Sequence, residues 1–254
     1  MNIIEIASKD NPKIKHLRKL KNKKYRNEYA EFLVENFTTI KDAFQSGYKF
    51  KQVFITNEFL EKNKAEIENF SSEECYLINN RINESFSNLD TASGICAVYD
   101  KLDNKINFKK SIVYLNAISN PGNLGTILRS ALAFNFKNII LDENCVDLYN
   151  YKVINASKDA IFKLNIEIDK NLKSLKQIKK RMKVFSTRLE KSNNLDILKK
   201  EKIFCLVLGN ESHGIDNKIS NLSDAFIKIN MGDEIESLNV SSVAAIIFHQ
   251  IYNG

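Results

Sequence analysis

The carboxy-terminal half of the chain alternates short apolar segments of β type with longer segments of helical periodicity, and this alternation restricts the fold more than any other feature. The β-type segments are SIVYLNA (111–117), NIIL (138–141), KVFST (183–187), IFCLVLG (203–209) and AFIKI (225–229). Helical patterns occupy 123–135, 147–159, 171–181 and 237–251. Such alternation predicts an α/β fold with a mostly parallel sheet and helices on both of its faces.

The first hundred residues have a different pattern. Residues 11–30 place apolar side chains at helical spacing among many cations, which predicts a basic amphipathic helix. From Glu31 to Tyr99, helical segments alternate with short apolar ones, which predicts a second, small α/β unit. Segment 100–110 has little to bury and suits a linker. We therefore expect a basic helical segment (1–30), an α/β domain (31–99), a linker (100–110) and a larger domain (111–254).

The distribution of charge points to a polyanionic partner. The formal net charge is +7, and residues 1–30 carry nine Lys or Arg against three acids. A second basic window, Lys170 to Lys183, holds seven cations and no acid. Either cluster alone could be a solvated helix face, but two together favour nucleic acid, since each neutralised phosphate adds affinity. The predicted RNA-binding residues are cations of the amino-terminal segment: Lys13, Lys15, Arg18, Lys19, Lys21, Lys23, Lys24 and Arg26.

Other sequence features argue against membrane, disulfide and metal proteins. The longest apolar block near the carboxy terminus, Val243 to Phe248, is too short to span a bilayer, and the first thirty residues contain no apolar run of signal-peptide length. We expect a soluble, cytoplasmic protein with no membrane partner. The four cysteines lie far apart, form no CxxC pair and have no histidine partners nearby. Buried reduced thiols are expected, with no metal site.

Three polar, glycine-bearing loops follow strands of the predicted sheet: SNPGNLGT (119–126), GNESHG (209–214) and NMGDEIESLN (230–239). Ligands of open parallel sheets bind outside the carboxyl ends of the strands, so these loops are the expected site. They contain neither a P-loop nor a GxGxxG dinucleotide loop. A hydrolase with Ser212 as nucleophile is disfavoured, because Asn210 replaces the leading glycine of GxSxG.

Several polar residues of these loops have two interpretations. Asn123 and Arg129 lie near the start of a predicted helix, where anions are favoured, but they could equally be a capping residue and a surface cation. Ser237 and Asn239 lie in the first turn of helix 237–251, where they could cap the helix, line a pocket, or do both.

Taken together, the three loops closely resemble the knotted SPOUT methyltransferases of the SpoU/TrmH class, which methylate the ribose 2′-oxygen of tRNA or rRNA. The resemblance covers residues 111–251 through NPGNLGTILRSALAF, LVLGNESHGI and IKINMGDEIESLNVSSVAA. A weaker resemblance relates FLVENFTTIKDAFQSGYKFKQVFIT and TASGICAVY to the family's RNA-binding domain of ribosomal-protein-like α/β fold. Pattern alone would predict an unknotted sheet. Only the resemblance implies a carboxy-terminal trefoil knot.

The resemblance also implies a cofactor, S-adenosylmethionine, held by the second and third loops. The corresponding positions are Leu208, Gly209, Asn210, Gly214, Ile229, Met231, Leu238 and Asn239. Glycines of these loops, Gly209, Gly214 and Gly232, would let the backbone approach the ligand closely. The positions that match the family's catalytic residues are Arg129, Asn123, Glu211, Ser237 and Asn239. Because a guanidinium stays protonated, we expect Arg129 to hold the substrate phosphate and the developing alkoxide, and the general base stays open.

The expected function is therefore S-adenosylmethionine-dependent methylation of a ribose 2′-hydroxyl in rRNA or tRNA. The resemblance further implies a homodimer through the carboxy-terminal domain, with helix 237–251 and the helix of the first loop near the interface. The chain departs from the family pattern at Asn165 and Asn230, where proline is common, and in NASKDAIF (155–162), which lacks the usual Arg and Gly. The alternative function is a non-catalytic RNA-binding or ribosome-assembly protein on the same fold.

Overall fold

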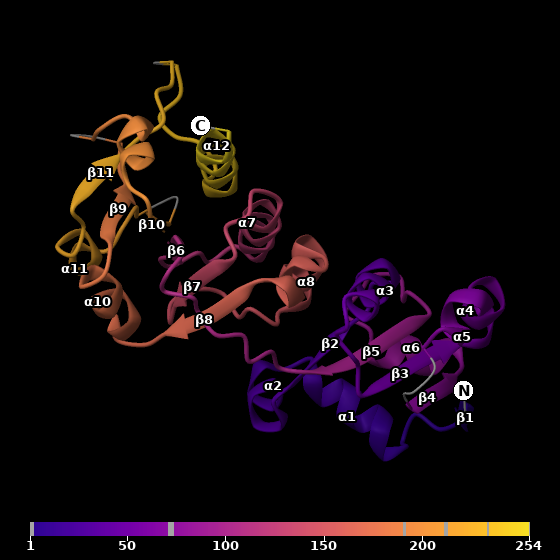
Figure 1. Cartoon of the computed structure of the whole chain (residues 1–254). Coiled ribbons are helices and arrows are strands. Elements are labelled where there is room, and N and C mark those ends of the chain that lie inside the picture. The colour runs from indigo at the N-terminus through magenta and orange to yellow at the C-terminus, as the bar shows by residue number, and fades with distance from the viewer. Residues whose placement is uncertain (1–2, 71–73, 190–191, 211–212, 233, 254) are drawn as a thin grey trace. The chain divides into compact units, whose positions relative to one another are not determined.

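A computed structural model describes residues 3–70, 74–189, 192–210, 213–232 and 234–253. The chain forms two compact units, which are considered separately (Figure 1). The first comprises Met1–Leu102 and Tyr149–Phe162, and the second comprises Asp103–Leu148 and Lys163–Gly254. The division after Leu102 falls inside the predicted linker, whereas Tyr149–Phe162, which was predicted to lie in the larger domain, groups with the first unit.

The first unit contains a five-stranded mixed sheet in the order β1-β4-β3-β5-β2. Its strands are β1 (Ile3–Ile6), β2 (Glu31–Val34), β3 (Gln52–Thr56), β4 (Glu74–Ile78) and β5 (Ile95–Asp100). Its helices are α1 (Pro12–Leu20), α2 (Lys23–Tyr29), α3 (Phe37–Gln45), α4 (Asn57–Lys62), α5 (Lys64–Glu68), α6 (Asn80–Phe86), α8 (Tyr151–Ser157) and α9 (Ala160–Lys163), whose last residue already belongs to the second unit. Strand β5 runs antiparallel to β2 and β3, while β1 and β3 are parallel to β4. The predicted α/β character of this part is therefore confirmed.

The predicted basic helix over residues 11–30 is two helices, not one. Helix α1 buries the apolar side chains Ile14, Leu17 and Leu20 against the sheet core. The chain then turns at Asn22, whose side-chain oxygen accepts a hydrogen bond of 2.9 Å from the backbone N–H of Lys24 and starts α2. The break follows from this cap, because an asparagine that satisfies a free amide stabilises a new helix start.

Asparagine caps the amino ends of seven helices in the part of the chain that the structure describes. In each of them the side-chain oxygen accepts from a backbone N–H of the first turn, which fixes where the helix begins. These residues are Asn11, Asn22, Asn36, Asn79, Asn120, Asn150 and Asn239. Helix α12 therefore begins at Val240, three residues later than predicted, and Ser237 precedes the helix.

The second unit contains a six-stranded sheet in the order β11-β9-β10-β6-β7-β8, and every described pairing in it is parallel. Its strands are β6 (Ile112–Leu115), β7 (Asn138–Asp142), β8 (Asn165–Asp169), β9 (Lys183–Thr187), β10 (Phe204–Leu208) and β11 (Ala225–Ile227). Its helices are α7 (Pro121–Ala133), α10 (Lys173–Lys179), α11 (Asn217–Ser220), α12 (Val240–Tyr252) and the 3₁₀ helix η1 (Leu195–Lys200).

Helices cover both faces of this sheet. On one face, side chains of α10 and α11 pack with those of β6, β9 and β10, including Cys205. On the other face lies Phe204, the neighbour of Cys205, because successive side chains of a strand point to opposite sides. Its ring lies 6.4 Å from that of Phe136, which stacks at 4.7 Å on Phe248 of α12. Helices α7 and α12 lie side by side (Figure 1). The mostly parallel sheet with helices on both faces is confirmed, and the trefoil knot stays a prediction.

The described cysteines are free thiols, and Cys75, Cys96 and Cys205 are buried while Cys145 is half-buried. Among the described residues, no group of three or more His, Cys, Asp or Glu side chains is arranged to hold a metal ion. None of the described helices has both the length and the apolar character needed to span a bilayer.

Candidate active site

The three predicted loops leave the same edge of the second sheet. In the parallel register Leu208 at the end of β10 pairs with Leu115 at the end of β6, and Ile227 at the end of β11 pairs with Thr187 at the end of β9. The first loop follows β6, the second follows β10 and the third follows β11. Parallel register thus collects at one carboxyl edge three segments that are far apart in the sequence.

Asn116 fixes the first two loops to each other. Its backbone N–H donates to the carbonyl of Leu208 at 2.9 Å, and its side-chain oxygen accepts from the backbone N–H of Asp216 at 3.0 Å. Its side-chain amide donates to Asp142 at 2.5 Å, and the other oxygen of Asp142 accepts from the backbone N–H of Ala117. Asn116 and Asp142 are 3% and 4% exposed. A fully paired buried polar network of this kind holds a rigid framework under the loops.

The second loop closes on itself through its backbone. The N–H of Asn210 donates to the carbonyl of Gly214 at 3.0 Å, and the N–H of Gly214 donates back to Asn210 at 2.9 Å. A Cβ at position 209 would lie 2.5 Å from the Gly214 carbonyl oxygen, and Gly214 has a φ of +66°. Gly209 is therefore required by the close approach of the loop to itself. The predicted catalytic residue Glu211 and its neighbour Ser212 lie outside the described residues.

A side-chain hydrogen bond joins the third loop to the first. The amide nitrogen of Asn239 donates to the side-chain oxygen of Asn123 at 3.0 Å. The oxygen of Asn239 accepts from the backbone N–H of Ser241 at 2.8 Å and from its hydroxyl at 2.6 Å, which caps α12. Asn239 thus both starts the last helix and bridges two loops.

Arg129 lies on α7, six residues after Asn123, with its side chain exposed to solvent. No acidic residue that the structure describes forms an ion pair with it. A guanidinium in this situation keeps its donors available for an anionic ligand.

An open cavity of about 740 Å³ lies at this edge. It is lined by seven of the predicted site residues: Gly209, Asn210, Gly214, Ile229, Met231, Ser237 and Leu238. Leu208 and Asn239 do not line it. The side chain of Leu208 is fully buried in β10, and its carbonyl accepts the hydrogen bond from Asn116. Backbone groups around Leu208 were predicted to hold the ligand, but the carbonyl of Leu208 already accepts this hydrogen bond.

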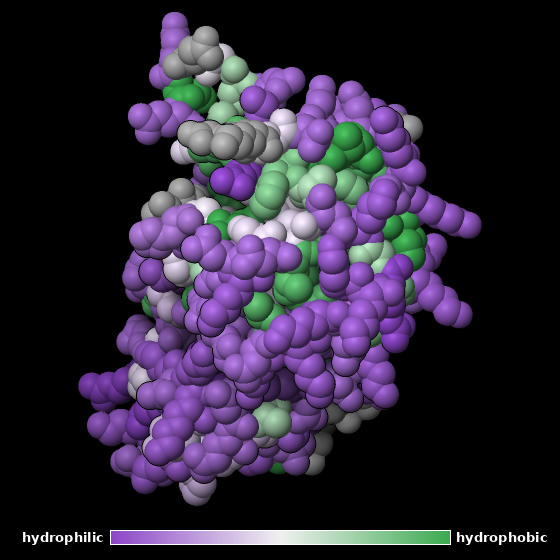
Figure 2. Space-filling model, turned by 90° about the vertical axis from the view of Figure 1, so that its left-hand side faces the viewer, coloured by the Kyte–Doolittle hydropathy of each residue, from purple (hydrophilic) through white to green (hydrophobic). Residues whose placement is uncertain are grey.

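The cavity mixes polar groups with uncovered apolar side chains. Ile229, Met231 and Leu238 are half-buried, and within the described part of the chain no backbone hydrogen bond engages any of the three. Figure 2 shows hydrophobic residues reaching the surface in the upper half of the view, with hydrophilic residues around them. Uncovered apolar surface beside free backbone N–H and C=O groups suits a small molecule with both a flat ring and polar edges.

Part of the cavity wall was not predicted. Thr187 ends β9, whose carboxyl end lies beside that of β10, and it lines the cavity together with Arg188 and Leu189, which follow the strand. The same edge rule applied to KVFST (183–187) would have found them. Val243 and Ile247 of α12 also line the cavity, so part of the apolar stripe of this helix faces the cavity.

The predicted RNA-binding cations on α1 and α2 differ in their surroundings. Lys15, Lys19, Lys21, Lys23 and Lys24 are exposed, whereas Lys13 and Arg18 are partly covered and contact Glu74 and Ser85. Arg26 requires a correction. It is 7% exposed, and its guanidinium donates to the carbonyls of Leu20 and Lys21 at 2.8 and 2.7 Å. Arg26 therefore satisfies the free carbonyls that end α1, a structural role that hides it from an external phosphate.

Comparison with known proteins identifies the family to which this site belongs. Residues 110–249 match the sequence model of the SpoU rRNA Methylase family, and residues 11–97 match that of the MRM3-like substrate binding domain. A similar protein is the 23S rRNA (guanosine(2553)-2′-O)-methyltransferase RlmP of Bacillus subtilis, 26% identical over 249 residues, which cover 97% of this chain and 98% of that protein.

Solved structures share the fold along the whole chain. The AdoMet-bound rRNA methyltransferase of Sinorhizobium meliloti superposes with a TM-score of 0.84 at 23% identity, covering 99% of this chain and 98% of that one. The SpoU methyltransferase AviRb of Streptomyces viridochromogenes, in complex with AdoMet, superposes with a TM-score of 0.86 at 20% identity, covering 96% and 97%. Because the family match spans more than half of the sequence and contains all three loops, the chain belongs to the SpoU rRNA Methylase family.

Proposed function

We propose that this protein transfers a methyl group from S-adenosylmethionine to a ribose 2′-hydroxyl of ribosomal RNA. The observation that carries the proposal is the hydrogen bond from Asn239 to Asn123 at the carboxyl edge of the sheet. It joins the first and third loops of the family pattern beside the cavity that the second and third loops line.

The cavity suits this cofactor in size and in chemistry. Its volume of about 740 Å³ lies within the range of roughly 300–1,000 Å³ that is usual for small-molecule sites. Backbone groups at Ile229, Met231 and Leu238 can pair with the edge of an adenine, while the side chains of these residues cover its faces. Relatives support this assignment, since two structures of the same fold were solved with AdoMet bound.

The cofactor supplies an electrophilic methyl group carried on a positively charged sulfur. The residues of this chain have two tasks, which are to align the ribose oxygen with that methyl group and to stabilise the charge that develops as the hydroxyl loses its proton. Arg129 is a permanent cation on α7, the helix that also carries Asn123, and suits the second task through several N–H donors. Asn123, Asn239 and Ser237 position the substrate, and Glu211 is a further candidate from the sequence motif.

Ribosomal RNA is the proposed substrate because the relative from Bacillus subtilis, which matches along nearly its whole length, is named for 23S rRNA. The match to a substrate-binding domain at residues 11–97 suits an RNA-binding role for the first unit. Exposed lysines of α1 and α2 are the proposed phosphate contacts there. For such a substrate we propose a cytoplasmic location.

We further propose a homodimer formed through α7 and α12. An open, mainly apolar hollow of about 690 Å³ lies along these helices and is lined by Phe134, Lys199, Ala245, Ile246, His249, Gln250 and Asn253. Ile246 is 40% and Tyr252 is 61% exposed, so a second copy packed on this face would bury apolar and aromatic surface of α12. A mass equal to one chain by light scattering at micromolar concentration would contradict the dimer.

Two measurements test the function. Calorimetry with S-adenosylmethionine should show binding at one site per chain, and the purified protein should transfer labelled methyl groups to ribosomal RNA from a strain that lacks the gene. Mapping of 2′-O-methyl groups then identifies the nucleotide. A protein that binds RNA but neither binds the cofactor nor transfers methyl groups would be the non-catalytic RNA-binding protein instead.

A further inference from the structure

The amino-terminal edge of the second sheet, opposite the candidate active site, carries a row of cations. Lys183 begins β9 and pairs in register with Phe204 of β10, while Ile112 of β6 pairs with Cys205 and with Asn138 of β7. Strands β6, β7, β9 and β10 therefore begin at the same edge of the sheet. Each of these starts has cations at or just before it: Lys109 and Lys110 before β6, Lys137 before β7, Lys179 to Lys183 at β9, and Lys200 and Lys202 before β10.

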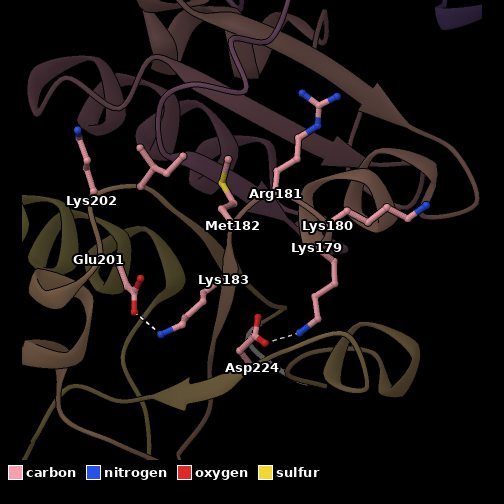
Figure 3. Close-up of a pocket in the computed structure, with 9 residues that line it drawn as sticks. Lys179, Lys180, Arg181, Met182, Lys183, Glu201, Lys202 and Asp224 are labelled. Atoms are coloured by element: carbon pink, nitrogen blue, oxygen red, sulfur yellow. Dashed lines mark hydrogen bonds and ion pairs between the residues drawn. The ribbon is translucent and has the colours of Figure 1, made fainter.

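An open depression of about 410 Å³ lies in this row. It is lined by Lys179, Lys180, Arg181, Met182, Lys183, Glu201, Lys202, Ile203 and Asp224 (Figure 3). Five cations and two acids give the lining a net charge of +3. Only Met182 and Ile203 offer apolar surface, so the depression suits phosphate groups better than a base.

Two of the cations are held in place by acids. Lys179 forms an ion pair with Asp224 at 2.5 Å, and Lys183 forms one with Glu201 at 2.5 Å. Asp224 is itself fixed by the backbone N–H of Val184, which donates to it at 2.8 Å. Burial raises the pKa of Asp224, but the hydrogen bonds from Lys179 and Val184 outweigh this effect and lower the pKa, so the carboxylate stays charged.

Three cations remain for an external anion. In Figure 3 the charged ends of Lys180, Arg181 and Lys202 point away from the two ion pairs. None of the acidic residues in the described ranges pairs with these three, and all three are exposed. The guanidinium of Arg181 lies 5.0 Å from the ring of Phe108, which restricts its position without neutralising its charge.

We propose that this basic edge, with Lys180, Arg181 and Lys202 at its centre, binds the phosphate backbone of the substrate RNA at a distance from the methylated nucleotide. The inference rests on the proposed RNA substrate. A row that continues past the depression along four strand starts suits a polymer of phosphates rather than a single ion. Strand β10 has five residues and spans about 16 Å, so the basic edge and the active-site edge require different nucleotides of one large RNA.

The experiment compares two triple variants of the full-length protein. The test variant is Lys180→Gln with Arg181→Gln and Lys202→Gln. The control variant is Lys152→Gln with Lys170→Gln and Lys218→Gln, which removes the same charge from exposed positions outside the basic edge and outside residues 11–97. Binding to 23S ribosomal RNA and to a short single-stranded oligoribonucleotide is measured over a range of salt concentrations, together with the affinity for S-adenosylmethionine.

For ribosomal RNA, the test variant should bind at least about tenfold more weakly near 0.1 M salt, and the slope of log affinity against log salt should fall by about 2 to 3. The control variant should bind like the wild type. The cofactor should bind all three proteins equally, because its cavity lies at the other edge of the sheet. The short oligoribonucleotide should lose less affinity in the test variant than ribosomal RNA does, because it contacts fewer phosphate-binding cations.

The outcomes separate this inference from the function on which it rests. If the wild type bound no ribosomal RNA, both would be wrong. If the wild type bound it and the test variant did the same with an unchanged slope, only the inference would be wrong, and the basic edge would be a solvated surface or would serve an acidic protein. Equal weakening in the control variant would also contradict it, since net charge alone would then explain the loss.

Discussion

The side-chain amide of Asn239 donates a 3.0 Å hydrogen bond to the side-chain oxygen of Asn123, across 116 residues of sequence. This bond connects the start of α12 with the first turn of α7, and the two helices carry the loops of the candidate site. Asn239 also caps α12, so one side chain couples the stability of the last helix to the position of the first loop.

The bond predicts energetic coupling between the two asparagines. Asn239→Ala should lower the free energy of unfolding by about 1 kcal/mol, because the helix loses its cap, and Asn123→Ala should have a smaller effect. A double-mutant cycle in urea should give a coupling energy of about 0.5–1.5 kcal/mol. Strictly additive effects would show that the two side chains do not interact in solution.

The close packing around Gly209 predicts that a larger residue there would disturb the second loop. An alanine there would place its Cβ 2.5 Å from the Gly214 carbonyl oxygen, so the second loop must shift. Gly209→Ala should cost about 1–3 kcal/mol of stability and weaken the binding of S-adenosylmethionine. Gly232→Ala is the matched control for stability, because no protein atom lies within 4 Å of a Cβ at that position. Unchanged cofactor affinity in Gly209→Ala would show that this loop does not bind the cofactor.

Lys158 ends α8 with a φ of 55° and a ψ of −136°, a combination that only glycine adopts without strain. Lys158→Gly should therefore raise the free energy of unfolding by roughly 0.5–2 kcal/mol, since relief of strain exceeds the extra entropy of glycine in the unfolded chain. Asn135→Gly, at a φ of 63°, is the control and should change stability little, because asparagine tolerates that region. A loss of stability in Lys158→Gly would mean that the strain is absent.

The hydrogen bonds of Glu31 predict that the stability of the first unit depends on pH. Its carboxylate accepts from Lys51 and pairs with His16, each at 2.6 Å. Burial raises the pKa of Glu31, but these two hydrogen bonds outweigh it and hold the pKa below its ordinary value. A carboxyl whose pKa is lower in the folded state contributes stability above its unfolded pKa and loses it as the pH falls through the folded pKa.

Glu31→Gln should therefore lower the free energy of unfolding by about 1–3 kcal/mol at pH 7, and the difference from the wild type should shrink as the pH falls below about 4. Glu58→Gln serves as the control, since Glu58 is exposed and forms its ion pair with Lys62 in the next turn. That variant should change stability by at most about 0.5 kcal/mol. If Glu31→Gln still lowered the free energy of unfolding at acid pH, the loss would come from the changed shape of the side chain and not from its missing charge.

Sequence patterns predicted the second unit better than the first. Strands β6, β7 and β10 consist mainly of consecutive apolar residues, the signature of a buried parallel strand, and they were found nearly to the residue, as was β9 (KVFST). Strand β8 (NIEID) was missed because it is an edge strand with charged residues among its apolar ones. Strand β2 (EFLV) has only four residues and gives too short a signal.

The candidate site was predicted as a set of loops but not as a set of contacts. The edge rule for parallel sheets located all three loops from their position after apolar strands. The buried pair Asn116 and Asp142 was not found, because a polar residue at the end of a strand looks the same whether it is solvated or paired. Arg26 was misassigned for the same reason, since sequence does not distinguish a cation that ends a helix from one that faces solvent.

The most direct test of the account is single-turnover methyl transfer from labelled S-adenosylmethionine to ribosomal RNA by the wild type, Arg129→Ala and Arg129→Lys, with cofactor affinity measured for each. Arg129 does not line the cavity, so cofactor binding should be unchanged. Loss of its donors should slow transfer by roughly 100- to 1000-fold, or about 3–4 kcal/mol, and lysine should restore little, because an ammonium cannot reproduce a planar fork. Near-normal transfer by Arg129→Ala would contradict the account, because the exposed cation of α7 would then take no part in the reaction.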